Sequence, residues 1–126
     1  MSREPRWITS AVVIYVAEAV LEDTGEPFLL RDAGLLESAV MVPRNRWYYE
    51  NERDWLVLGL SLALAIARNH PFEQGNKRAA WFAMLNFFCQ GCRKHIENEQ
   101  NAITYAVLDV RTHLRTYSFY AHLGRM

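Results

Sequence analysis

The chain has 126 residues, the size of one domain, of which 51% are hydrophobic and 22% are charged. This composition excludes intrinsic disorder, because the apolar surface is ample to offset the entropy of ordering. The 14 basic and 14 acidic residues give a formal net charge of zero, so no basic excess draws the chain onto nucleic acid or anionic lipid. We expect a single domain over residues 1–126 that makes no direct contact with nucleic acid.

Neither the cysteines nor the N-terminus indicates secretion. Cys89 and Cys92 are the only cysteines, which is too few for the disulfide framework of a small secreted domain. The charged N-terminus is not followed by a cleavable hydrophobic signal. The most apolar run, residues 55–67, is shorter than the roughly 20 residues that a membrane span needs. These features predict a cytoplasmic protein with no membrane segment.

The first part of the chain predicts two helices. Thr9 or Ser10 can cap the first helix, and Gly25 suits the left-handed conformation that ends a helix. Asp32 can cap the second helix, which is expected to stop before Pro43 because proline does not fit a helix interior.

Residues 45–49 follow and are interpreted as a polar and aromatic connector. Asn51 can cap a third helix that reaches about Asn69 and is apolar nearly all round, which places it in the middle of a bundle. A fourth helix is expected to start near Asn76 and to end at Gly91.

The pattern as a whole predicts an all-α fold. Two further helices are expected over residues 98–111 and 116–123, and no alternating segment is long enough to build a sheet. The architecture is therefore a compact helical bundle with at most a small hairpin near residues 26–32.

The segment between the third and fourth helices, residues 70–78 with the sequence HPFEQGNKR, carries the most distinctive chemistry. A helix N-terminus offers unpaired N–H groups and a positive dipole end, which suit an anion and most naturally a phosphate. The residues that would surround such an anion are Gly75, Asn76, Lys77 and Arg78. His70, across the loop, can accept a proton near pH 7. A base that faces a phosphate site suggests transfer of a phosphorus-centred group to a hydroxyl.

An ordinary structural interpretation of the same residues stays open. His70 can simply end the preceding helix, and Lys77 and Arg78 can be solvated residues of a first turn. The chain has no Gly-x-x-x-x-Gly-Lys-Ser/Thr loop, so it is not a P-loop protein.

The run HPFEQGNKR resembles the signature loop of the Fic/Doc family, His-Pro-Phe-x-Asp/Glu-Gly-Asn-x-Arg. The upstream run GLLESA at residues 34–39, together with Pro43, resembles the region after the flap in death-on-curing (Doc) toxins. The resemblance spans roughly residues 8–95. It implies the all-helical Fic/Doc fold, in which the hairpin near residues 26–32 would be the flap that receives a segment of the target as an added strand.

The resemblance also implies a role for each residue of the loop. His70 would be the general base, and Phe72 would anchor the loop in the core. The phosphates of ATP would be bound by Gly75, Asn76, Lys77 and Arg78. Lys77 stands where adenylyl-transferring members have glycine and Doc has lysine. Trp81 stands where those adenylyl-transferring members have a second arginine. Both differences favour the Doc-like kinase branch.

One position departs from the family pattern. The acid that holds Mg2+ in the family falls at position 74, where this chain has Gln74. An amide oxygen ligates a hard cation only as a neutral dipole. The metal is therefore expected to be bound weakly at Gln74, to be held instead by the neighbouring Glu73, or to be lost.

The main functional hypothesis is a Doc-like toxin of a toxin–antitoxin pair. By resemblance, it would transfer a phosphoryl group from ATP to a Ser or Thr hydroxyl of a translation protein, elongation factor Tu, and so arrest growth. Two alternatives remain, namely an adenylyl or other nucleotidyl transferase on the same loop and a catalytically weak binding module. No self-inhibitory Ser/Thr-x-x-x-Glu-Gly/Asn motif occurs in the chain, so the resemblance implies a cognate antitoxin that supplies an inhibitory helix.

Overall fold

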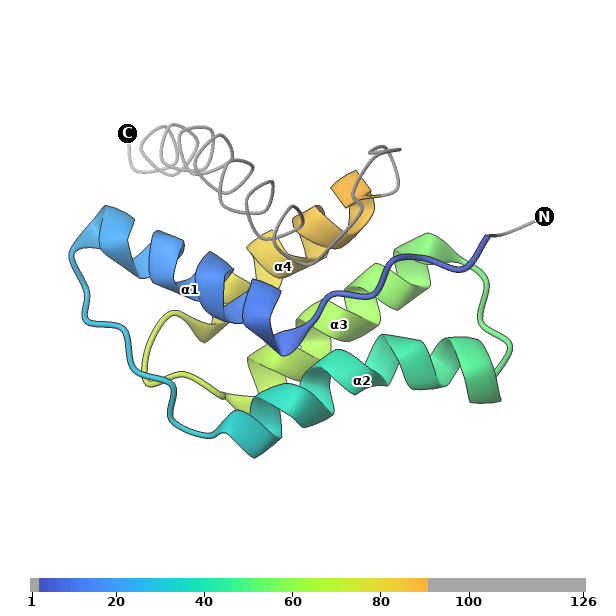
Figure 1. Ribbon diagram of the computed structural model, residues 1–126, viewed down its shortest axis with the longest axis horizontal. Helices are drawn as coiled ribbons and strands as arrows, with labels where there is room; N and C mark the ends of the chain where they lie inside the picture. Colours follow the sequence, from blue (N-terminus) through green and yellow to red (C-terminus); the bar gives the residue numbers. More distant parts are fainter. Residues whose placement is uncertain (1–2, 91–126) are drawn as a thin grey trace, which may run out of the picture.

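The computed structural model describes residues 3–90, which form four helices and no strand (Figure 1). The all-α prediction is confirmed for this part of the chain. Gly91, Cys92 and the helices expected over 98–111 and 116–123 lie outside the described residues. The helices are α1 (Ser10–Thr24), α2 (Ala33–Tyr49), α3 (Trp55–Asn69) and α4 (Asn76–Gln90).

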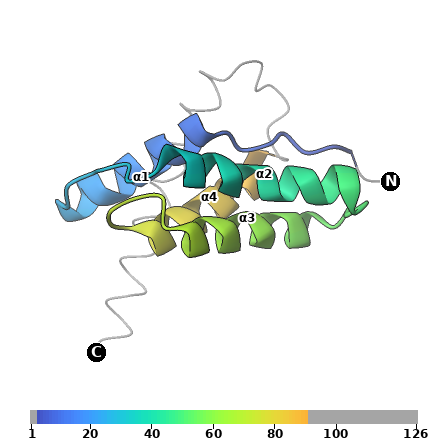
Figure 2. The same ribbon diagram turned by 90° about the horizontal axis from the view of Figure 1, so that it is seen from below.

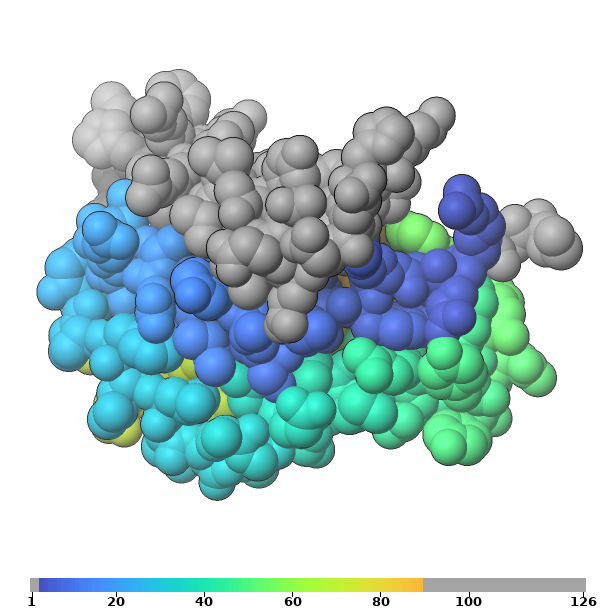
Figure 3. Space-filling view, viewed as in Figure 1, coloured from blue at the N-terminus to red at the C-terminus, as the bar shows by residue number. Residues whose placement is uncertain are grey.

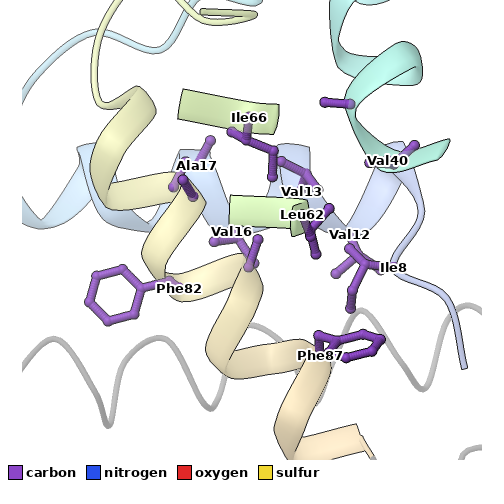
Figure 4. Close-up of a cluster of buried hydrophobic side chains, with 14 of the residues drawn as sticks. Ile8, Val12, Val13, Val16, Ala17, Val40, Leu62, Ile66, Phe82 and Phe87 are labelled. Atoms are coloured by element: carbon purple, nitrogen blue, oxygen red, sulfur yellow. The ribbon is translucent and has the colours of Figure 1, made fainter. Parts of the chain in front are cut away.

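The helices pack so that α3 lies between α2 and α4, while α1 packs mainly on α4 and touches α2 (Figures 1 and 2). Side chains from all four helices meet in one core (Figure 4). The most deeply buried include Val13 and Val16 of α1, Leu62 and Ile66 of α3, and Phe82 of α4. Among the described helices, none is both long and apolar enough to cross a membrane.

Local capping signals set three of the helix ends. The Thr9 hydroxyl accepts a hydrogen bond from the Val12 N–H at 3.3 Å, and the Asp32 carboxylate accepts one from the Leu35 N–H at 3.0 Å. Gly25 ends α1 with a positive φ of 72°, which a residue with a Cβ adopts only at a cost. The predictions for these three positions are confirmed.

The prediction that the second helix stops before Pro43 is wrong, because α2 continues through Pro43 to Tyr49. Residues 45–49 are therefore part of the helix and not a connector. Proline in a helix interior costs about 3 kcal/mol. A stripe of buried residues repeats at helical spacing along α2 and includes the proline itself: Leu36, Val40, Pro43 and Trp47. We attribute the continuation to this burial, since Trp47 is only 7% exposed and packs edge-on against Trp7 with 6.0 Å between ring centres.

The start of the third helix also differs from the prediction. Asp54, and not Asn51, caps α3, and its carboxylate accepts a hydrogen bond from the Leu56 N–H at 2.9 Å. Asn51 instead takes a left-handed conformation with φ of 54°, which asparagine tolerates better than most residues.

The apolar helix α3 is buried on one face only. Leu58, Leu62 and Ile66 are fully buried, whereas Leu56, Leu60 and Leu64 are 44–57% exposed. The expectation of a central helix is thus only partly met, because the outer face of α3 stays open among the described residues. Gly59 lets α4 approach α3 closely. A Cβ built on Gly59 would lie only 2.4 Å from the ring of Phe88.

Replacing Leu62 by alanine is expected to lower the free energy of unfolding by about 2–5 kcal/mol, because the side chain leaves a cavity in the core. The matched control is Leu60→Ala on the same helix, which is expected to cost no more than about 0.5 kcal/mol because Leu60 is exposed. Denaturant unfolding measures both values. Equal losses for the two variants would contradict the assignment of the two faces of α3.

Candidate functional site

The loop between α3 and α4 borders an open hollow of about 340 Å³. The residues that line it are His70, Glu73, Gln74, Gly75, Asn76, Lys77 and Arg78. All site residues expected from the sequence therefore border one space, except for the loop anchor Phe72, which is buried beneath it.

His70 sits where α3 ends. Its backbone N–H donates to the Ile66 carbonyl, and its φ of 49° turns the chain sharply away from the helix axis. A left-handed conformation is uncommon for a residue with a side chain and has to be supported by its surroundings. The turn leaves the imidazole exposed at the edge of the hollow.

Arg31 provides part of that support. Its guanidinium donates from Nε to the His70 carbonyl at 2.9 Å and from Nη2 to the carbonyls of His70 and Asn69. A cation at the C-terminal end of a helix is favourable because it meets unpaired carbonyl groups and the negative end of the dipole. Arg31 was not expected at the site. No local spacing could have revealed one, since 39 residues separate it from His70.

The connector between α1 and α2 pairs with the loop along their backbones. The Pro71 carbonyl accepts hydrogen bonds from the N–H groups of Arg31 and Asp32 at 2.8 and 3.0 Å, and the Glu73 N–H donates to Leu29 at 3.0 Å. Figure 3 shows the connector in cyan over the loop, of which only small yellow parts remain visible. The described residues contain no hairpin near 26–32. The segment instead forms a single antiparallel bridge with the loop, from Leu30 to Phe72.

The buried side chain of Asn76 binds the backbone of the loop. Its Oδ1 accepts from the Phe72 N–H at 2.9 Å, and its Nδ2 donates to the Phe72 carbonyl at 2.8 Å. These two bonds fix which way the amide points, so the remaining contact of 3.3 Å runs from Nδ2 to Nδ1 of His70 as the acceptor. Asn76 thereby contacts the imidazole from the inner side of the loop.

Phe72 holds the same loop from below. Its side chain is 1% exposed and packs against Phe28 of the connector, with 5.7 Å between the ring centres. The loop is therefore fixed at its apolar side by Phe72 and at its polar side by Asn76.

The first turn of α4 lines the hollow. Gly75 has a φ of 77°, and its carbonyl accepts the first helical hydrogen bond, from the Ala79 N–H at 2.8 Å. The N–H groups of Asn76, Lys77 and Arg78 precede this bond and have no acceptor within the helix. These N–H groups, with Lys77 beside them, could bind an anion at the start of α4.

Arg78 turns toward the end of α1. Its Nη2 lies 2.5 Å from the Glu26 carboxylate, and its Nη1 lies 3.4 Å from the Thr24 hydroxyl. The Thr24 hydroxyl donates to the same Glu26 carboxylate oxygen at 2.6 Å. This hydrogen bond first, and then the one from Arg78, lowers the pKa of the Glu26 carboxyl below its ordinary value, so the carboxylate stays charged at neutral pH. Neither Thr24 nor Glu26 was expected at the site.

The loop offers a divalent cation a single carboxylate. The position that needs a carboxylate holds Gln74, and the exposed Glu73 is its only acidic neighbour along the loop. Within residues 3–90 no three acidic, histidine or cysteine side chains come together. Mg2+ in a nucleotide site uses only one or two carboxylates beside the phosphates. Glu73 and Gln74 are therefore the candidate ligands on this loop.

Replacing Asn76 by alanine is expected to lower the free energy of unfolding by about 1–3 kcal/mol, because both backbone groups of Phe72 lose their buried partner. The adjacent variant Lys77→Ala is the control, since Lys77 is exposed and is expected to leave stability within about 0.5 kcal/mol of the parent. Thermal and denaturant unfolding provide the measurement. An Asn76→Ala protein as stable as Lys77→Ala would show that the amide does not hold the loop.

Comparison with known proteins adds one clear finding. The model of the Fic/DOC family matches residues 7–88, from just before α1 to near the end of α4, and includes the whole hollow. No curated protein and no solved structure matches the chain. Because the family model covers well over half of the 126 residues, the chain belongs to the Fic/Doc family.

Proposed function

We propose that this protein is a Doc-like toxin that transfers the γ-phosphoryl group of ATP to a Ser or Thr hydroxyl of a protein of the translation machinery, by resemblance elongation factor Tu, in the cytoplasm. Family membership supports the coarser part of the proposal, because Fic/Doc proteins are transferases that act on nucleotide substrates. The single observation that carries it is that His70 and the first turn of α4 border the same hollow.

Two residues of α4 indicate which group of ATP is transferred. Lys77 matches the lysine of Doc, and adenylyl-transferring members have glycine there. Trp81 replaces the second arginine of those members, and its side chain is 49% exposed. The side chain at this position therefore brings no positive charge to a second phosphate. Both residues favour phosphoryl transfer over nucleotidyl transfer.

The chemistry follows from the placement of base and anion site. The imidazole of His70, which borders the hollow, accepts the proton of the target hydroxyl. The hydroxyl oxygen then forms a bond to the γ-phosphorus, the bond from that phosphorus to the bridging oxygen breaks, and ADP leaves. The N–H groups of α4, Lys77 and Arg78 bind the phosphates, so catalysis rests on positioning and electrostatics.

A separate antitoxin remains part of the proposal. The self-inhibitory motif of the family is missing from the sequence, and an inhibitory helix of a partner would direct an acidic residue at Arg78. In the structure Arg78 already holds Glu26 of its own chain, so such a partner would have to replace this contact.

A second candidate is a binding module with little turnover. Gln74 favours it, because family members use a divalent metal with ATP and the acid that would hold this metal is replaced. Such a module would bind nucleotide, antitoxin or target without transferring a group.

Transfer from labelled ATP separates these possibilities. The parent protein, incubated with cell lysate, is expected to transfer label from the γ-phosphate and not from the α-phosphate. His70→Ala is expected to reduce this transfer by about 10²–10⁴-fold, the usual effect of losing a general base, with an unchanged melting temperature. Label from the α-phosphate would indicate a nucleotidyl transferase, and no transfer of either label would favour the binding module. Full activity of His70→Ala would contradict the assigned base.

Restoring the acid tests the role of position 74. Gln74→Asp is expected to tighten Mg2+ binding in the presence of ATP and to raise the rate of transfer, because a carboxylate holds a hard cation by charge. Calorimetric titration with Mg2+ measures the binding independently of turnover. Glu73→Ala is the companion variant, and loss of activity in it would show that Glu73 has taken over the metal. Unchanged Mg2+ affinity in Gln74→Asp would contradict a metal role for this position.

A further inference from the structure

The side chain of Arg31 binds the backbone on both sides of the His70 Cα. The Asn69 carbonyl lies in the peptide plane before that atom, and the His70 carbonyl lies in the plane after it. Nη2 of Arg31 donates to both carbonyls, to the first at 3.3 Å, and Nε donates to the second at 2.9 Å. One guanidinium therefore restrains the angle between the two planes, and with it the φ and ψ of His70.

The backbone of His70 depends on such a restraint. Its φ of 49° and ψ of 55° are left-handed, a conformation that residues with a Cβ rarely adopt. Pro71 follows it, and a residue before proline prefers an extended backbone. Strained conformations of this kind persist only where the surrounding structure enforces them.

Arg31 is itself held in place by backbone contacts. Its N–H donates to the Pro71 carbonyl at 2.8 Å, so this one residue binds three consecutive carbonyls of the chain, at positions 69 to 71. The end of α3 is tied to α2 as well, because Nδ2 of Asn69 donates to the Leu35 carbonyl at 2.9 Å. The guanidinium therefore acts between two fixed segments and can hold the residue between them.

The backbone angles of His70 decide where its Cβ, and hence its imidazole, points. We propose that Arg31 is a positioning residue whose guanidinium keeps His70 left-handed, so that the imidazole borders the hollow beside the start of α4. The proposal rests on the proposed function, because it takes His70 as the base. Arg31 is not among the residues that line the hollow, so in this role it acts through His70.

The simpler role for Arg31 is that of a helix cap. A cation at the C-terminal end of α3 stabilises the helix whether or not it orients His70. The two roles predict different losses in an Arg31 variant. Loss of a cap lowers the melting temperature alone, whereas loss of a positioning residue also lowers the rate of transfer at temperatures where the protein is fully folded.

The experiment measures transfer from γ-labelled ATP to a fixed amount of cell lysate, well below the melting temperature of each variant. Arg31→Ala is expected to lower the maximal rate about 10²-fold, the scale for a displaced catalytic group, and to leave the KM for ATP unchanged. Arg31→Lys is expected to give an intermediate rate, because an ammonium group lacks the planar fork that binds both carbonyls. Arg68→Ala is the matched control, since it removes an exposed cation from the last turn of the same helix, and its rate is expected to equal that of the parent.

Nuclear magnetic resonance separates failure of this inference from failure of the proposed function, because it needs no turnover. The Cα and Cβ chemical shifts of His70 report its backbone conformation. They are expected to move toward extended values in Arg31→Ala and to stay unchanged in Arg68→Ala.

Two results would overturn the positioning role while His70 stands as the base. These are unchanged His70 shifts in Arg31→Ala, or a parent rate in Arg31→Ala when His70→Ala is inactive. A parent protein that transfers no label, or a fully active His70→Ala, would overturn the proposed function and the catalytic role of Arg31 together, even where the shifts move. If Arg31→Ala does not fold, Arg31→Lys supplies both measurements, and a parent rate in that variant would overturn the inference.

Discussion

The site depends above all on the Asn76 amide, which binds both backbone groups of Phe72 and touches the ring of His70. One buried side chain thereby ties the end of α3 to the start of α4 and sets the distance between the His70 ring and the first turn of α4. Without these bonds the N–H and carbonyl groups of Phe72 would be buried without partners, which would destabilise the loop. Phe72 and the pairing with the connector after α1 hold the remaining side of the loop.

Local signals in the sequence were enough to predict much of the fold. Thr9, Gly25 and Asp32 act through neighbours a few residues away, and their caps were predicted correctly. Pro43 was misjudged because the cost of a proline is local, whereas the burial of Trp47 that outweighs it comes from tertiary packing. The exposed outer face of α3 was also missed, since a sequence that is apolar all round does not show which face a neighbour covers.

The residues of the candidate site also fall into a group that the sequence predicts and a group that only the folded structure reveals. His70 and the residues from Glu73 to Arg78 could be predicted because they are contiguous and the helix start brings them together. Arg31 and Glu26 could not, because the chain has to fold before Arg31 meets the carbonyl of His70 and Glu26 meets Arg78. Both residues come from the connector after α1. This connector thus contributes a cation to the backbone of His70 at one point and a carboxylate to Arg78 at another.

The central claim is that His70 and the first turn of α4 surround one phosphate group. Nuclear magnetic resonance of the labelled protein, titrated with a non-hydrolysable ATP analogue, tests it most directly. We predict that the His70 ring and the backbone N–H groups of Asn76, Lys77 and Arg78 shift together with one binding constant, while the exposed face of α3 around Leu60 does not shift. Shifts confined to other parts of the chain, or a His70 ring that does not respond, would contradict the account.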